Sequence, residues 1–156
     1  MEILPVIISL FISPETIRKS EGSKTIQVFS EIYFQLNPDI FFPMKSWDDF
    51  TVIILTCWIR NTISCFYSGS SVCYFMDGPY KFSIESNGET FHIVFFDNDK
   101  VICSINISKK EFLNILKKST NLVIRNLIQK NIITKETEEL QESFDNLQKL
   151  IQSDKL

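Results

Sequence analysis

The sequence predicts an α+β fold: an antiparallel sheet of about five to six strands, with a four-stranded C-terminal meander, packed by two to three helices. The main observation is a segment in which apolar and polar residues alternate through four short runs, as in strands with one buried face. The runs are Ser71–Met76, Tyr80–Glu85, Thr90–Phe96 and Val101–Ile107. Turn sequences separate the runs, and stretches with helical spacing of apolar residues lie on both sides of the segment.

The length of 156 residues favours a single domain over residues 1–156, because such a chain can bury roughly two-thirds of its unfolded surface in one core. Hydrophobic residues make up 44% and charged residues 22%, which is ordinary for a globular protein. The sequence has neither an internal repeat nor a stretch of linker composition. We therefore expect one α+β domain.

Two strands are predicted before the first helix. Residues 3–12 form an apolar run that ends at Ser13-Pro14, and the polar residues up to Ser23 predict a loop or a short helical turn. Residues 24–37 are apolar at every second position, which predicts a long strand. Its inward residues are Ile26, Val28, Ile32, Phe34 and Leu36. Ser30 places a polar residue on this inward face, so we expect a β-bulge near it.

The first helix is predicted to begin at Ser46, whose hydroxyl is placed to accept a hydrogen bond from the backbone N–H of Asp49. Asp48 and Asp49 would then lie in the first turn, where the helix dipole favours negative charge. Apolar residues recur on one stripe at three- and four-residue spacing. They are Trp47, Phe50, Ile53, Ile54, Cys57 and Trp58. The helix should end near Gly69, which readily adopts the left-handed conformation of a helix end.

Three turn sequences separate the strands of the meander. They are Asp77-Gly78-Pro79, Asn87-Gly88 and Asp97-Asn98-Asp99. Asn-Gly tolerates the positive φ values of a two-residue hairpin turn. The third strand is apolar on both parities, so we expect it to be central and partly covered on both faces. In the fourth strand Val101, Cys103, Ile105 and Ile107 are expected to share one face.

Two more helices are predicted after the meander. Ser108 and Glu111 form a capping-box pattern at the start of a helix that runs to about Gln129. A third helix, about residues 134–152, starts at Thr134. Its apolar stripe consists of Leu140, Phe144, Leu147 and Ile151. This last helix either packs on the domain or associates with another chain.

The net charge of −3 argues against nucleic-acid binding, which requires a basic face that neutralises phosphates. The N-terminal apolar run of about 10 residues is too short to span a bilayer, which takes roughly 20. This run also lacks the positive residues and the cleavage site of a signal peptide. We therefore expect a cytoplasmic protein with no nucleic-acid partner and no membrane partner.

Residues that often carry catalysis or bind metals occur here in patterns that structural roles explain. His92 is the only histidine and has no recognisable nucleophile beside it. Asp48 and Asp49 fit helix capping, and Asp97 and Asp99 flank a turn that lacks the glycine and glutamate of a calcium loop. The four cysteines lack CxxC or metal-ligand spacing, so we expect buried free thiols. They are Cys57, Cys65, Cys73 and Cys103. We predict no catalytic residue, no cofactor, no metal site and no enzyme activity.

Two sequence segments carry a resemblance to known proteins. Trp47-Asp48-Asp49-Phe50 opens the predicted helix, which holds a second tryptophan at Trp58, and Tyr74-Phe75-Met76-Asp77-Gly78-Pro79-Tyr80 follows. This pattern, over roughly residues 25–130, resembles a group of small bacterial proteins that look like immunity proteins encoded beside polymorphic or contact-dependent toxins. The resemblance implies a cytoplasmic protein that binds and neutralises a cognate toxin domain without catalysis.

An immunity function predicts an acidic and aromatic contact surface, because many toxin domains act on nucleic acid and are basic. The predicted contact residues are Asp77, Tyr80, Glu85, Glu89, Asp97 and Asp99, and the protein would be a monomer or a weak homodimer. Two alternatives remain open. One is a secretion chaperone or adaptor that holds an export substrate with a strand edge or its C-terminal helix. The other is a small enzyme or ligand-binding domain with a cleft near His92.

Overall fold

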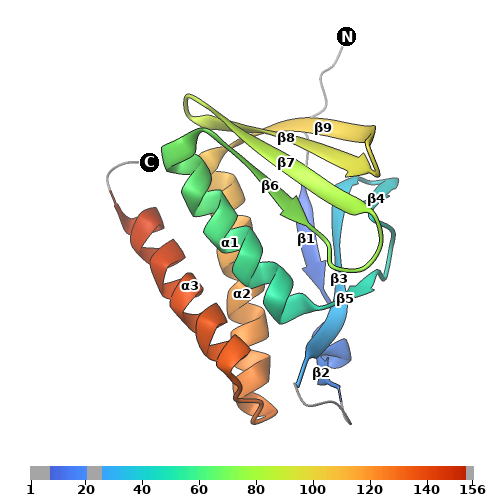
Figure 1. Cartoon of the computed structure of the whole chain (residues 1–156), viewed down its shortest axis with the longest axis vertical. Coiled ribbons are helices and arrows are strands. Elements are labelled where there is room, and N and C mark those ends of the chain that lie inside the picture. The colour runs from blue at the N-terminus through green and yellow to red at the C-terminus, as the bar shows by residue number, and fades with distance from the viewer. Residues whose placement is uncertain (1–7, 21–25, 154–156) are drawn as a thin grey trace.

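Three helices and nine strands form the part of the chain that the computed structural model describes, residues 8–20 and 26–153. The helices are α1 (Thr51–Ser68), α2 (Lys109–Gln129) and α3 (Lys135–Gln152). The strands form two antiparallel sheets, one of five strands and one of four. Figure 1 shows the three helices gathered on one side of the four-stranded sheet. The predicted α+β fold class is confirmed.

The five-stranded sheet is built around one long strand, β3 (Val28–Asn37), with which each of the other four pairs antiparallel. These four are β1 (Ser9–Ile12), β2 (Arg18–Lys19), β4 (Ile40–Phe42) and β5 (Asp48–Asp49). A short 3-10 turn, η1 (Pro14–Thr16), separates β1 from β2. The predicted first strand is confirmed over residues 9–12. Its residues 3–7, and residues 24–25 of the predicted second strand, lie outside the described residues.

Side chains of β3 alternate between buried and half-buried, as their apolar period predicts. Ile26, expected on the inward face, instead precedes the strand and is exposed. The bulge expected near Ser30 is wrong, because the register is regular there and shifts only between Gln35 and Asn37, opposite β4. Ser30 stays in the buried row because its hydroxyl bonds to the hydroxyl of Thr51, so its polar group is satisfied inside the core.

The prediction that Ser46 caps α1 is wrong. Ser46 has a positive φ of 63°, and α1 begins only at Thr51, after an N-cap residue, Phe50, that makes no side-chain capping bond. Asp48 and Asp49 lie in β5 and pair with β3. Because this segment bonds across the sheet, its backbone is extended and its two carboxylates point to opposite sides.

The end of α1 matches the prediction. Gly69 adopts a left-handed conformation with φ 92°, and its N–H donates to the carbonyl of Cys65 at 2.9 Å. Trp58 is fully buried, as expected, but Cys57, predicted on the same stripe, is exposed. The buried stripe is centred on Leu55 and Trp58, and successive helix residues are about 100° apart, so Cys57 points away from it.

The meander is confirmed, with its four strands in sequence order across the sheet. They are β6 (Ser70–Tyr74), β7 (Tyr80–Asn87), β8 (Thr90–Asp97) and β9 (Lys100–Ser108). β8 is central, as predicted, and Phe91, Ile93 and Phe95 are fully buried on its inner face. The residues of its other face, His92, Val94 and Phe96, are half-buried, as expected for partial cover, although the helices all lie on the inner side (Figure 1).

The fourth strand departs from its predicted pattern at one residue. Ile105 and Ile107 are buried, whereas Val101, expected beside them, is 56% exposed. The register between β8 and β9 shifts between Phe95 and Phe96, where Ile102 is the extra residue. Such a bulge reverses the side to which the preceding residue points. Val101 therefore belongs to the outer face of the sheet.

The last two helices begin at the predicted residues, although at Ser108 only half of the predicted capping box forms. Ser108 accepts a hydrogen bond from the N–H of Glu111 at 3.0 Å, and Thr134 forms a capping box with Thr137. The apolar stripe of α3, with Leu140 and Leu147 fully buried, packs on α1 and α2. Of the two placements considered for this stripe, the one within the domain is observed. No helix in residues 8–20 and 26–153 has the length and apolar character needed to cross a membrane.

Aromatic rings join the two sheets to α1. Phe34 of β3 stacks on Trp58 with ring centroids 5.6 Å apart, and it meets Phe82 and Phe95 edge-on at 5.4 Å each. Edge-on and offset pairs of this kind add to the stabilisation that burial provides. The cluster fixes the inner face of the meander against β3 and α1.

Candidate functional site

Four of the six predicted contact residues meet at one end of the meander. Tyr80 pairs with Asp97 across β7 and β8, and the N–H of Asn98 donates to the carbonyl of Pro79 at 2.9 Å. The β6–β7 turn and the β8–β9 turn are therefore adjacent. We call the four residues the acidic end: Asp77, Tyr80, Asp97 and Asp99.

The other two predicted contact residues lie apart from the acidic end. Glu85 is exposed on the outer face of β7, in register with Ser70 on one side and His92 on the other. Glu89 lies in the turn between β7 and β8, at the opposite end of these strands. These two carboxylates therefore belong to a different region of the surface.

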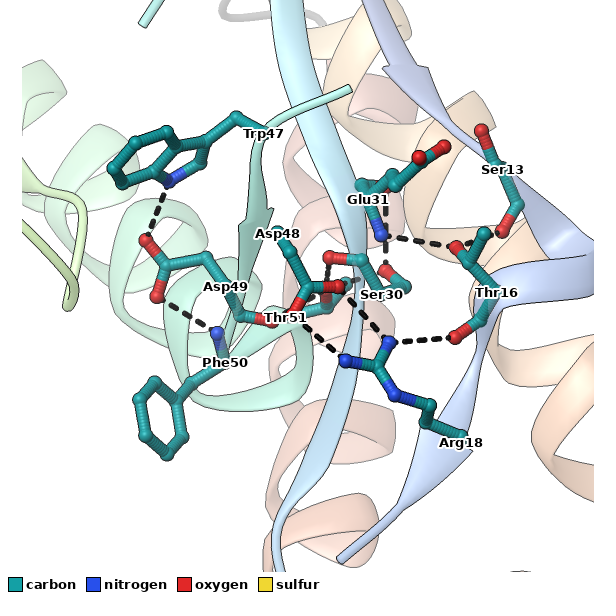
Figure 2. Close-up of polar contacts among 10 residues, drawn as sticks. All are labelled: Ser13, Thr16, Arg18, Ser30, Glu31, Trp47, Asp48, Asp49, Phe50 and Thr51. Carbon is teal, nitrogen blue, oxygen red and sulfur yellow. Dashed lines mark hydrogen bonds and ion pairs between the residues drawn. The ribbon is translucent and has the colours of Figure 1, made fainter.

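The turn that carries Asp77 is held by a buried carboxylate, that of Asp49 in β5, which is 2% exposed. Its Oδ2 accepts from Nε1 of Trp47 at 3.0 Å and from the backbone N–H of Asp77 at 3.2 Å. Its Oδ1 accepts from the backbone N–H of Phe50 at 2.7 Å. Figure 2 shows the carboxylate between Trp47 and Phe50. Asp49 thus ties the start of α1 to the β6–β7 turn.

The electrostatics of Asp49 are set by two opposing effects. Burial raises the pKa of its carboxyl above the ordinary aspartate value, because the charged form loses hydration. The three N–H donors favour the ionised form and lower the pKa, but the burial effect is the larger one. The hydrogen bonds of Asp49 hold the Trp47 indole and two backbone N–H groups in place, so we assign this residue a positioning role.

Aromatic packing joins the same two segments. The rings of Trp47 and Tyr80 meet edge-on, with centroids 5.1 Å apart. Between them lies Gly78, with φ 76°, where a Cβ would come within 3.1 Å of the Tyr80 ring and 3.3 Å of Trp47. Glycine is required here both by the backbone conformation and by the close approach of the two rings.

Side chains of α1 also bond to β6. Nε1 of Trp58 donates to the carbonyl of Tyr74 at 2.9 Å, and Nδ2 of Asn61 donates to the carbonyl of Val72 at 3.0 Å. The two segments that carry the sequence resemblance therefore contact one another through Asp49, Trp47 and Trp58. Trp58 is fully buried, and Trp47 is half-buried against the core.

An exposed apolar row crosses the outer face of the meander and ends at the acidic end. Tyr74, Lys81, Phe96 and Val101 lie in register on the four strands. Tyr74 is 57% and Val101 56% exposed. With their exposed or half-exposed apolar neighbours they form what we call the outer patch: Val72, Tyr74, Met76, Phe96 and Val101. Sequence reasoning missed this surface. The signal was present in residues 72–76, which are apolar on both parities.

No family model, curated protein or solved structure matches this chain. Among residues 8–20 and 26–153, no group of three or more His, Cys, Asp or Glu side chains could hold a metal ion. A hollow of about 530 Å³ opens beside Phe66, Glu89 and Lys109, and another of about 320 Å³ lies between β1 and α2. His92 lines neither of them.

Lys81 lies inside the outer patch with its charge paired. Its Nζ is 3.3 Å from Oδ1 of Asp99 and 5.5 Å from the centroid of the Phe96 ring. His92, farther along the outer face, bonds through Nδ1 to Oδ1 of Asn106 at 2.9 Å. Lys100, which is exposed and in register with Asp97, adds a second positive charge, so the three aspartates at this end exceed the two lysines by one charge.

A second polar cluster links β2 to β5, two short strands that both pair with β3. Arg18 donates from both terminal nitrogens to the carboxylate of Asp48, at 2.9 and 2.8 Å, and also to the carbonyl of Thr16 (Figure 2). Both side chains of the ion pair are about half exposed. Asp48, predicted to serve a helix N-terminus, instead links two short strands.

The cysteines are free in the described structure, as predicted. Cys65 and Cys73 are buried, and burial raises the pKa of both thiols. Cys103 is half-buried, and Cys57 is exposed, so the prediction of a buried thiol is wrong for Cys57. A buried thiol with a raised pKa is a poor nucleophile, because the thiolate is the reactive form.

Proposed function

We propose that this protein acts in the cytoplasm as an immunity protein that binds and neutralises a cognate bacterial toxin domain by non-covalent masking. The observation that carries the proposal is the outer patch, an exposed apolar and aromatic row that ends at a cluster of carboxylates. Protein interfaces combine an apolar, aromatic centre with a polar rim. Apolar residues gathered on one exposed face mark interaction sites more often than scattered ones do.

Charge indicates the kind of partner. At the rim of the outer patch three aspartates, Asp77, Asp97 and Asp99, outnumber two lysines, Lys81 and Lys100. The whole chain has a net charge of −3. A basic surface, such as that of a toxin domain that acts on nucleic acid, is complementary to this rim and is attracted to it at long range. Masking of such a domain requires surface complementarity and no catalytic group.

Among the alternatives, a chaperone could use the open edge of β9, whereas the helix form of the chaperone and the enzyme with a cleft at His92 lack a supporting observation. A chaperone that used α3 to hold an export substrate would need the apolar stripe of that helix, and this stripe is buried against α1 and α2. An enzyme with a cleft at His92 would need a hollow there. His92 instead bonds to Asn106 on an open sheet face.

The test is binding and protection, with the product of the neighbouring gene as the candidate toxin. The two proteins should co-purify, and cells that express the toxin should survive only when this chain is present. Tyr74→Lys and Asp77→Lys should each weaken binding at least tenfold, about 1.4 kcal/mol, and should reduce protection.

Matched controls replace a residue of the same type elsewhere on the surface. Tyr67→Lys changes an aromatic residue on α1 that is 75% exposed, and Asp39→Lys changes an exposed carboxylate beside β4. Both variants should bind like the wild type. Absence of binding and of toxicity in the neighbouring product, or equal affinity of Tyr74→Lys and Tyr67→Lys, would refute the proposal.

A further inference from the structure

The two edges of the meander differ in how their backbone groups are satisfied. On the β6 edge, side chains of α1 donate to two carbonyls, those of Val72 and Tyr74. On the opposite edge, β9 pairs with β8 and with no other strand among residues 8–20 and 26–153 (Figure 1). An edge strand with unpaired N–H and C=O groups is a template for another strand, and proteins usually block it with charges, proline or cover.

The backbone groups that face away from β8 can be assigned from the ladder. The N–H of Lys109 donates to the carbonyl of Glu89, and every second residue of an antiparallel strand bonds to the same neighbour. In the part of β9 that follows the bulge, the odd-numbered residues therefore bond to β8. Ser104 and Asn106 direct their backbone groups away from β8. Within the residues in view, the one contact to these groups is a weak one at 3.8 Å, from the thiol of Cys103 to the carbonyl of Ser104.

The side chains of β9 do not block this edge. The strand reads Lys-Val-Ile-Cys-Ser-Ile-Asn-Ile-Ser and holds one charge, Lys100, at its first position. Val101 and Ile102, next to it, are 56% and 43% exposed. A short segment of high β-propensity with no proline and almost no charge favours pairing with another strand.

We propose that the outer edge of β9 pairs antiparallel with β9 of a second copy of this chain, about a two-fold axis at Ser104. The proposal does not rest on the immunity function, but it uses Val101, which is also a residue of the outer patch. This register uses the strand from Lys100 to Ser108 and covers Val101 and Ile102. An axis at Asn106 would leave both of these apolar residues uncovered.

Charge supports a second copy as the occupant. With the axis at Ser104, each Lys100 faces Ser108 of the other copy, and the two lysines lie about 27 Å apart along the strands. This separation exceeds the Debye length of about 8 Å at physiological ionic strength, so the strand does not repel its own copy. A symmetric contact of this type closes at two chains.

The experiment is sedimentation equilibrium of the full chain over a wide range of concentration. The wild type should change from a species of 18.2 kDa towards one of twice that mass as the concentration rises. Ser104 faces its own copy across the axis, so Ser104→Lys places two like charges opposite one another, as does Ser104→Asp. Each variant alone should raise the dissociation constant at least tenfold, and an equal mixture of the two should recover dimers.

The control is Ser70→Lys, which adds the same charge to an exposed serine on the other edge strand, β6, and should dimerise like the wild type. Recovery in the mixture also shows that the two Ser104 variants are folded. A mass that stays at 18.2 kDa at the highest concentration overturns the proposal. So does a mixture that associates no better than its components, or equal effects of Ser104→Lys and Ser70→Lys.

Discussion

The backbone N–H of Asp77 donates to Oδ2 of Asp49 across 28 positions of sequence. Asp49 belongs to a two-residue strand of the five-stranded sheet, and Asp77 to a turn of the four-stranded one. The bond therefore links the two sheets at the point where the outer patch meets the acidic end. The conformation of this turn depends on a carboxylate that is buried beneath it.

We expect Asp49→Asn to lower the free energy of unfolding by about 2 kcal/mol, because an amide group replaces one oxygen that accepts from buried N–H donors. Urea denaturation at neutral pH measures the change. Asp39→Asn, at an exposed position, is the control and should stay within about 0.5 kcal/mol of the wild type. Equal stabilities of the two variants would contradict the role given to Asp49.

The pH dependence of this effect has a defined sign. Because burial raises the pKa of Asp49 in the folded state, the folded protein binds a proton more tightly there than the unfolded chain does. The stability that protonation contributes is complete below the unfolded pKa and is lost as pH rises through the folded pKa. The gap in unfolding free energy between wild type and Asp49→Asn should therefore widen as pH falls from neutral. A gap that narrows on acidification would show a lowered pKa instead.

Gly78→Ala should destabilise the protein more than Gly88→Ala. Both glycines have positive φ, 76° and 61°, so backbone strain in the alanine variant should lower the free energy of unfolding by about 1 kcal/mol at either position. Only at Gly78 does a Cβ also press on Tyr80 and Trp47, whereas Gly88 has open space. Urea midpoints and tryptophan fluorescence of the two variants test this, and equal midpoints would exclude the close packing at Gly78.

Two threonines in the helical layer offer a way to stabilise the fold. The hydroxyls of Thr62 and Thr120 are buried and have no hydrogen-bond partner among the described residues. An unsatisfied buried hydroxyl costs about 1 kcal/mol or more, so Thr62→Val and Thr120→Val should each raise the melting temperature. Thr56→Val is the control, because the hydroxyl of Thr56 donates to the carbonyl of Val52 at 2.8 Å. This variant should show no gain.

The Arg18–Asp48 pair should contribute little to stability. Both side chains are about half exposed, and exposed pairs contribute at most about 1 kcal/mol. Asp48→Asn should therefore reduce the unfolding free energy by less than that amount. The difference should shrink further in high salt, which screens exposed charges. Chemical denaturation in urea at low and high salt measures it. A large difference that is insensitive to salt would show that the pair is shielded from solvent.

Local signals were sufficient to predict the meander and most helix ends. Asn87-Gly88 and the alternation around it define a hairpin within about ten residues, and the fold keeps this hairpin. Its two loop residues are Gly88 and Glu89, one position later than predicted, because Asn87 pairs with Thr90 as the last residue of β7. Gly69, Ser108 and Thr134 act at helix ends through groups only three or four residues away. Such interactions are visible in sequence because the partners are neighbours in the chain.

Non-local pairing explains the errors in the fold. Ser46 to Asp49 has the spacing of a helix cap, but β3 lies alongside and bonds to Asp48 and Asp49 as a strand. A two-residue strand has no periodicity of its own. The side of Val101 likewise depends on a bulge in register with Phe95 and Phe96, which the sequence of β9 alone does not indicate.

The candidate site was predicted only in part, because the exposure of a strand residue also depends on contacts with residues far away in the sequence. Turn chemistry indicated Asp77 and Asp99, and both lie at the acidic end. Tyr74 and Val101 were missed, because apolar residues on a strand are assigned first to the core. Their exposure becomes evident only when the helices are seen to occupy a single side of the sheet.

The bonds from Trp58 and Asn61 to the carbonyls of β6 have a consequence for polymerisation. A sheet that is open on both margins can add monomers without limit and grow into a fibre. In this sheet α1 occupies two outward carbonyls of the β6 margin, which disfavours addition there, so we expect pairing through β9 to stop at two chains. The indole that anchors α1 in the interior is thus expected to disfavour fibre growth through this margin as well.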